Sequence, residues 1–240
     1  MRHTGLMLWM AMLATSAAAE TGYYVVTPYP NDGERVVDFK YWNAKPSGKP
    51  PRDLPEIGFA YNVNSRWYTE LSVAWFRFGA GSEKLASVEW QNDVMLTQGQ
   101  YPFDLALHSS VSRAESDHSV GLELGPEIQT EIGPLQLNLN LFLQRDLRVT
   151  PSESTELAYQ WQLRYHGRAA LQFGAQGFGE VGKWNDWLPR SRQSHRAGPA
   201  VFGSLPMGGR QVLRYEAAYL IGTNSAQNAK SVTLRVQYAF

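Results

Sequence analysis

The stretch PLQLNLNLFLQ, residues 134–144, alternates leucine with asparagine or glutamine along most of its length. Successive side chains of a strand point to opposite faces, so the leucines from Leu135 to Leu143 fall on one face and the amides on the other. A helix would scatter the same leucines around its whole circumference. The stretch therefore predicts a β-strand with one continuous apolar face.

Similar alternating stretches recur along the chain and predict twelve strands. The expected strands cover residues 35–43, 56–64, 67–78, 85–97, 101–112, 118–131, 134–146, 155–165, 168–181, 197–205, 211–221 and 230–240. Most are close to the roughly 9–11 residues that a tilted strand needs to cross a bilayer. Connections after the even-numbered strands are short, such as GQ after the fourth, whereas most of the others are longer and polar. This rhythm is typical of an outer-membrane barrel with periplasmic turns and extracellular loops.

The first residues have the pattern of a secretory signal. Arg2 and His3 precede the apolar run GLMLWMAML, and the small residues of ATSAAAE follow. This pattern predicts a signal peptide over residues 1–19, cleaved after Ala19. Residues 20–34 fit no strand, and their prolines and Asp-Gly predict a lead-in segment or a small plug. The barrel itself is expected over residues 35–240.

Composition excludes several classes of function. The chain has no cysteine, which rules out disulfides, lipid attachment through a thiol, cysteine nucleophiles and thiolate metal sites. Its 22 basic and 22 acidic residues balance. Such a charge lacks the concentrated basic face that nucleic-acid binding requires, so no nucleic-acid partner is expected.

The end of the chain, VTLRVQYAF at residues 232–240, is another alternating strand that finishes on an aromatic residue. It resembles the C-terminal signal of Gram-negative outer-membrane proteins. The resemblance implies that Tyr238 and Phe240 are recognised by the barrel-insertion machinery. With the signal peptide and the strand pattern, it favours an all-β transmembrane antiparallel barrel in the outer membrane, with both termini periplasmic. The competing fold is a secreted β-sandwich, whose sheets would show the same alternation.

The polar faces of the strands predict the residues that line the lumen. They are Asp38, Lys40, Glu70, Glu89, Asp93, Asp104, His108, Glu123, Glu127, Gln129, Glu131, Asn138, Asn140, Gln160, Gln162, Arg164, Arg214, Glu216, Arg235 and Gln237. An acidic wall facing a partly basic one would select small polar or ionic solutes in a narrow channel. Alternatively, these charges pair and fill the lumen, and the barrel acts through its extracellular loops.

Aromatic residues are expected at the two membrane interfaces. On the periplasmic side the candidates are Trp67, Tyr101, Tyr165, Tyr238 and Phe240, and nearer the outer rim Trp42, Trp75 and Tyr219. The loop GKWNDWLPRSRQSHR carries Lys183, Arg190, Arg192 and Arg196. These cations could pair with lipopolysaccharide phosphates, remain solvated, or fold inward with the loop to constrict the pore.

A barrel hydrolase is the third interpretation. Asp104 and His108 share the lumen face, but at about 3.3 Å per residue they are too far apart for a direct hydrogen bond. Asp117 and His118 belong to an outer loop, where neighbouring side chains point apart. The sequence therefore predicts no catalytic residue, no cofactor and no metal site.

The layout of a signal peptide followed by one barrel with glycine-rich strands resembles a known family. Strands such as LQFGAQGFGEVG (171–182) and RAGPAVFGSL (196–205) are similar to those of barrel proteins of the meta-pathway of phenol degradation. The resemblance implies passage of small organic compounds across the outer membrane, and it assigns no functional residues.

Overall fold

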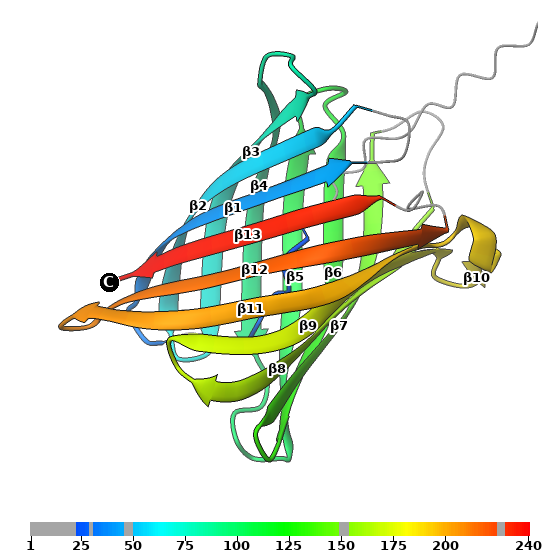
Figure 1. The fold of residues 1–240 in the computed structure, drawn as a ribbon. Coiled ribbons are helices and arrows are strands. Elements are labelled where there is room, and N and C mark those ends of the chain that lie inside the picture. The colour runs from blue at the N-terminus through cyan, green and yellow to red at the C-terminus, as the bar shows by residue number, and fades with distance from the viewer. Residues whose placement is uncertain (1–22, 29–30, 46–49, 149–153, 225–228) are drawn as a thin grey trace, which may run out of the picture.

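The computed structural model describes residues 23–28, 31–45, 50–148, 154–224 and 229–240. Within these ranges, twelve long antiparallel strands close into a barrel (Figure 1). They are β1 (Arg35–Lys45), β2 (Arg52–Asn64), β3 (Trp67–Phe78), β4 (Lys84–Met95), β5 (Phe103–Ala114), β6 (Val120–Ile132), β7 (Leu135–Leu147), β8 (Glu156–Arg168), β9 (Leu171–Lys183), β11 (Ser194–Gly208), β12 (Gln211–Asn224) and β13 (Lys230–Ala239). The twelve predicted strands are confirmed, with ends that shift by a few residues.

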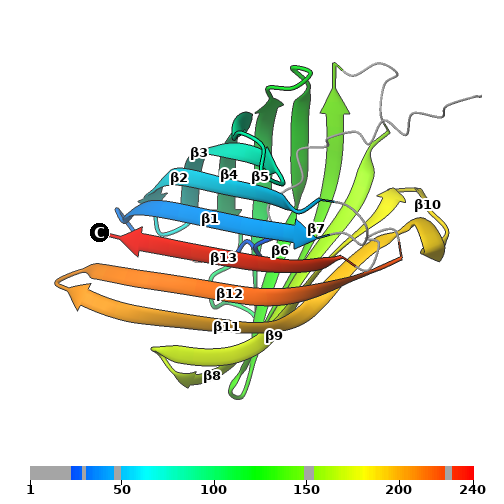
Figure 2. The same ribbon diagram turned by 45° about the horizontal axis from the view of Figure 1, so that its top comes forward.

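The barrel closes where its first strand meets its last. β1 pairs with β13 from Val36 opposite Ala239 to Lys45 opposite Lys230, and with β2 on its other side. Figure 2 shows β1 between these two neighbours. β1 therefore begins where β13 ends, and this end of the barrel is called the terminal rim. The described residues contain no helix that is long and apolar enough to cross a membrane.

Short turns gather at the terminal rim, as the sequence predicts, with one exception. The connection from β4 to β5 is not the tight GQ turn that the sequence suggested but runs over residues 96–102. The amides of Leu96 and Thr97 both donate to the carbonyl of Leu105, which ends the regular ladder early. Gly99 then turns the chain with a φ of 75°, which side chains rarely allow. At the opposite rim, the connection between β9 and β11 holds the short strand β10 (Asp186–Trp187) and the 3₁₀ turn η1 (Arg190–Arg192).

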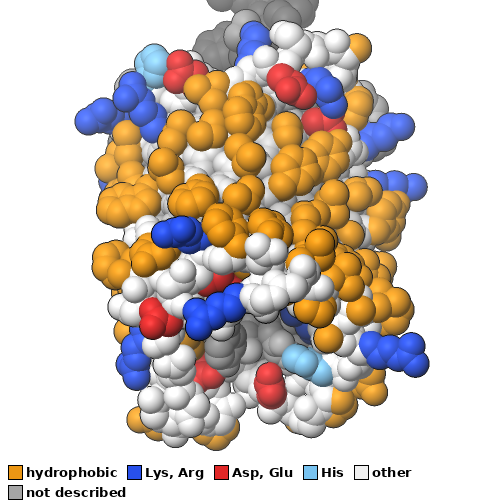
Figure 3. All heavy atoms as spheres, turned by 90° about the vertical axis from the view of Figure 1, so that its left-hand side faces the viewer, with side chains coloured by type: hydrophobic (Ala, Val, Ile, Leu, Met, Phe, Trp, Pro, Cys, Tyr) orange, Lys and Arg blue, Asp and Glu red, His pale blue; other side chains and the backbone are white. Residues whose placement is uncertain are grey.

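The alternation of the sequence becomes the two sides of the barrel wall. Along β7, Leu135, Leu137, Leu139, Leu141 and Leu143 are 37–40% exposed, whereas the amides between them are buried inside. In Figure 3, hydrophobic side chains cover the upper and middle parts of one outer face, and most of the charged side chains in view lie around its margins. A bilayer requires such a surface, because apolar side chains face the hydrocarbon while a closed barrel pairs every backbone group internally.

The N-terminal residues 23–28, called here the lumen segment, lie inside the barrel. The ring of Tyr23 packs edge-on against Trp42 and Phe178, with centroids 5.3 and 5.4 Å apart. The amide of Val26 donates to Oε1 of Gln160, and its carbonyl accepts from the side chain of Asn140. The predicted signal peptide, residues 1–19, lies outside the described residues.

The predicted position of Trp42 at the outer membrane interface is wrong. Its side chain is 5% exposed and packs on Tyr23 within the lumen. Trp42 shares its face of β1 with Asp38 and Lys40, both of which are buried inside the barrel, so periodicity places it inward.

A close approach of β6 and β7 leaves no room for a side chain at Gly125. A Cβ there would lie 1.8 Å from the backbone carbonyl oxygen of Leu141. We expect Gly125→Ala to lower the free energy of unfolding by about 1–3 kcal/mol, because backbone must shift to relieve the overlap. Denaturant unfolding of the refolded protein, followed by tryptophan fluorescence, measures the change. Gly167→Ala is the matched control, since the nearest atom there is 3.8 Å away. Equal stability of the two variants would contradict the prediction.

Candidate functional site

The predicted lumen residues occupy the inner face of the wall, at different depths. Those that are buried are Asp38, Lys40, Glu70, Asp93, His108, Glu123, Glu127, Gln129, Asn138, Asn140, Gln160 and Gln162. Those that are partly exposed are Glu89, Asp104, Arg164, Arg214, Glu216, Arg235 and Gln237. Glu131 is exposed at the terminal rim. The lumen-facing charges gather mainly in two groups.

The first group surrounds Lys40. Its Nζ lies 2.8 Å from a carboxylate oxygen of Glu56 and 2.8 Å from one of Glu70. The same Nζ lies 4.2 Å from the ring centroid of Tyr24 in the lumen segment. Glu56 and Tyr24 were missed by the sequence prediction. The register of β1 and β2 pairs Lys40 with Glu56, and alternation within each strand does not reveal this pairing.

A neighbouring pair continues this group along β1 and β13. The guanidinium of Arg235 donates to Oδ2 of Asp38 from Nη2 at 2.6 Å and from Nε at 2.9 Å. Arg235 also lies over the ring of Tyr24, 4.8 Å from its centroid. Two cations thus contact the ring of Tyr24, and the negative face of an aromatic ring attracts such charges. The lumen segment is fixed by these charges as well as by its apolar contacts.

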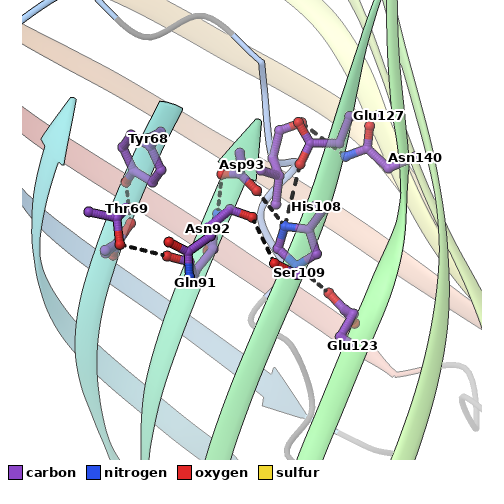
Figure 4. Close-up of polar contacts among 12 residues, drawn as sticks. Tyr68, Thr69, Gln91, Asn92, Asp93, His108, Ser109, Glu123, Glu127 and Asn140 are labelled. Carbon is purple, nitrogen blue, oxygen red and sulfur yellow. Dashed lines mark hydrogen bonds and ion pairs between the residues drawn. The ribbon is translucent and has the colours of Figure 1, made fainter. Parts of the chain in front are cut away.

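The second group lies on the wall formed by β4, β5 and β6. Nδ1 of His108 lies 2.6 Å from Oδ1 of Asp93 and 3.4 Å from Oε1 of Glu127, and Nε2 lies 3.0 Å from Oε1 of Glu123. The imidazole ring packs against Phe142, with centroids 4.6 Å apart. Figure 4 shows the three acidic side chains converging on His108 from the two neighbouring strands.

Among the cavities lined by described residues, two larger ones lie next to each other in the lumen. The larger, about 630 Å³, extends to the terminal rim, where Tyr101 and Glu131 line it. The smaller, about 240 Å³, lies beside it, and Thr27 of the lumen segment lines both. Three basic residues also line both cavities: Arg164, Arg214 and Arg235. Arg214 pairs with Glu34 at 2.8 Å, whereas Arg164 donates to Gln162 and stacks on the ring of Phe202.

The structure gives Asp104 and His108, a pair that the hydrolase interpretation considered, different partners. The carboxylate of Asp104 accepts from the amide of Gly99 at the turn, while His108 contacts Asp93. Asp117 accepts a hydrogen bond from the backbone N–H of Ser119, which lowers the pKa of the Asp117 carboxyl below its ordinary value. His118 is exposed and has a left-handed φ of 58°.

The basic residues predicted for the loop at the opposite rim differ in exposure. Lys183, Arg190 and Arg192 are exposed. Arg196 belongs to β11 rather than to the loop, and its guanidinium lies 4.2 Å from the ring centroid of Tyr23. The start of β11 therefore contributes to the packing around the lumen segment.

Comparison with known proteins decides the fold. No family model and no curated protein matches the chain, so the resemblance to the phenol-degradation barrels has no support from these comparisons. The COG4313 outer membrane channel from Pseudomonas putida F1 matches with a TM-score of 0.61 and 9% identity, over 90% of this chain and 99% of that one. This chain has the fold of an outer-membrane β-barrel.

Two porins match the barrel over similar lengths. The KdgM porin, solved in complex with disordered oligogalacturonate, has a TM-score of 0.57 and 10% identity. The match covers 85% of this chain and 99% of the porin chain. The NanC porin has a TM-score of 0.56 and 11% identity, over 85% and 98%. At these identities the likeness concerns the fold.

Proposed function

We propose that this outer-membrane barrel is a narrow porin-like channel that passes small hydrophilic solutes. The observation that carries the proposal is the cavity of about 630 Å³, which extends from the terminal rim into a lumen lined by charged and amide side chains. Of the three arginines at the junction of both cavities, Arg214 and Arg235 are paired with Glu34 and Asp38, so Arg164 supplies the charge that favours small anionic solutes, since opposite charge raises the local concentration of a permeating ion. The solved structures of similar fold include porins and an outer membrane channel, which supports the same function.

The proposal includes an orientation and two partners. The terminal rim faces the periplasm, and Tyr238 and Phe240, whose rings stack with centroids 5.6 Å apart, form the signal for the insertion machinery. At the opposite rim, the exposed Lys183, Arg190 and Arg192 are placed to pair with lipopolysaccharide phosphates. The first partner is implied by the resemblance of the C-terminal strand to the outer-membrane insertion signal, and the second follows from the chemistry of the exposed cations.

Arg164 provides the test of solute selection. Among the described residues it makes no salt bridge at contact distance, and it lines both cavities, so its charge is available to a passing anion. In planar bilayers we expect Arg164→Gln to shift the reversal potential under a salt gradient towards cation preference. Arg168→Gln, which removes an exposed charge at the end of β8, is the control and should leave selectivity unchanged. Channels whose selectivity is the same in both variants would contradict the role given to Arg164.

A second candidate function is a filled barrel that acts through its outer loops. The observation in its favour is the buried cluster around Tyr23, in which Trp42, Phe178, Phe202 and Leu220 pack across the lumen. Such a barrel would be folded, shown by heat-modifiable migration in gels, yet silent in the bilayer. Discrete openings of the wild-type protein would exclude it.

A further inference from the structure

The group around His108 has the composition and spacing of a metal site. Asp93, His108 and Glu127 each offer one ligand atom, and these atoms lie within 4.8 Å of one another. With metal–ligand bonds of about 2.0–2.2 Å, ligand atoms of a tetrahedral site lie about 3.3–3.6 Å apart. Nδ1 of His108 is 2.6 Å from Asp93 and 3.4 Å from Glu127. Small rotations of these side chains therefore reach a coordinating geometry.

We propose that Asp93, His108 and Glu127 bind one divalent transition-metal ion, of which zinc is the representative, in the wall of the lumen. Nδ1 of His108, the atom that both carboxylates approach, is the nitrogen ligand. One nitrogen and carboxylate oxygens suit zinc and its first-row neighbours, whereas calcium and magnesium prefer ligand sets made of oxygen alone.

The two buried carboxylates of the group would be stabilised by a bound cation. Asp93 and Glu127 are 5% and 0% exposed, and neither is in ion-pair contact with a lysine or arginine of the described residues. Their shared contact is one imidazole, which carries at most one positive charge and also faces Glu123. Buried charge without compensation is costly, and a divalent ion beside Nδ1 would neutralise both carboxylates at once.

Unpartnered oxygens near the same point give independent support. Within the described structure, neither carboxylate oxygen of Glu127 accepts a hydrogen bond, although both are buried. The amide oxygen of Asn140, opposite Glu127 in the register of β6 and β7, is also buried without a partner. Figure 4 shows Asn140 beside the carboxylate of Glu127. Buried acceptors of this kind are rare in folded proteins, and a cation bound at His108 would give the carboxylate of Glu127 a partner.

Residues behind the ligands hold them in place. The side-chain amide of Gln91 donates to Oδ2 of Asp93 at 2.6 Å, which leaves Oδ1 facing His108. Glu123 lies at Nε2, on the far side of the imidazole, and itself accepts a hydrogen bond from Gln144. A metal-binding histidine commonly donates its other ring N–H to a carboxylate, which fixes the tautomer and the ring orientation. Glu123, in ion-pair contact with Nε2 at 3.0 Å, is placed to act as such a positioning residue, and a small rotation would complete the hydrogen bond, since neither atom meets hydrogen-bond geometry in the described structure.

The site borders the cavity of the lumen. Asp93 and its neighbour Gln91 line the cavity of about 630 Å³ that extends to the terminal rim. An ion can thus reach Asp93, the first ligand, through the lumen without unfolding of the barrel. Metal binding at this site would not require the barrel to conduct.

Titration of zinc chloride into the refolded barrel, freed of metal with EDTA and held in detergent, tests the proposal by calorimetry. We expect one zinc ion per barrel, and cobalt(II) in its place should give the visible absorption of a low-coordinate site. His108→Gln and Glu127→Gln should each weaken binding by at least about 100-fold, because even changes behind the ligands weaken metal sites by up to about that factor. His166→Gln, which removes an imidazole beside Gln136 at the terminal rim, is the control and should bind as wild type.

Three results would overturn the proposal. The first is absence of zinc binding by wild-type barrel that migrates as folded in the gel assay. The second is equal loss of affinity in the His166→Gln control, which would indicate scattered surface binding. The third is displacement of zinc by calcium at equal concentration, which would indicate a site for hard cations. If His108→Gln does not refold, Asp93→Asn takes its place in the comparison.

Discussion

Loss of the lumen segment is expected to raise the single-channel conductance severalfold. A variant that lacks residues 20–28 would no longer place Tyr23 and Tyr24 between the walls, where they contact Trp42, Lys40 and Arg235. The two cavities that Thr27 borders would then merge into one wider passage. Conductance in planar bilayers at several salt concentrations, compared with that of the full barrel, measures the change.

The control for this experiment is an aromatic residue of the opposite rim. Trp184 is 56% exposed, and Trp184→Ala should leave the conductance as it is. Both variants must first show heat-modifiable migration, so that a change in current reflects a folded barrel. A truncated barrel that folds and conducts no better than the full one would show that the segment does not limit the passage.

Removal of the charge of Lys40 is expected to produce a large loss of stability. Lys40 is the only lysine or arginine of the described residues that forms a salt bridge with Glu56 or Glu70, and all three side chains are buried. Lys40→Met should lower the free energy of unfolding by about 3–5 kcal/mol, because truncation of one partner leaves buried charge uncompensated. Denaturant unfolding in detergent micelles, followed by tryptophan fluorescence, provides the measurement.

Two further variants separate the charge from the bulk of the side chain. Lys45→Met changes an exposed lysine at the end of the same strand and should have little effect. The triple variant Lys40→Met, Glu56→Gln, Glu70→Gln removes the cation and both carboxylates together, and it should recover much of the lost stability. Failure of the triple variant to recover would assign the loss to packing against Tyr24 rather than to charge.

The wall of the barrel is predictable from sequence because each strand carries its own signal. A strand between lipid and lumen has one apolar face and one polar face, and the alternation in β7 shows both faces within eleven residues. Trp42 shows where a general expectation about aromatic residues overrode that signal. Its neighbours on the same face of β1, Asp38 and Lys40, already indicate an inward position.

The groups inside the lumen depend on register, which local alternation does not reveal. With the expected strand ends at residues 97 and 101 paired, His108 would lie opposite Trp90. The longer connection over residues 96–102 shifts the pairing by three residues and places Asp93 opposite His108. For residues 20–34 the sequence left a lead-in segment and a small plug open, and nothing in the stretch YYVV indicates which surface it packs against.

The lumen segment occupies wall surfaces that a solute would otherwise contact, and it is covalently attached to the barrel. Residues 23–28 are joined to β1 by a few residues, so they compete for the lumen walls at an effective concentration on the order of millimolar. A solute that uses Arg235 or Lys40 must displace a competitor that never diffuses away. The solute concentration needed to occupy this lumen is therefore set by the chain itself. Changes in the sequence of residues 23–28 would raise or lower that concentration.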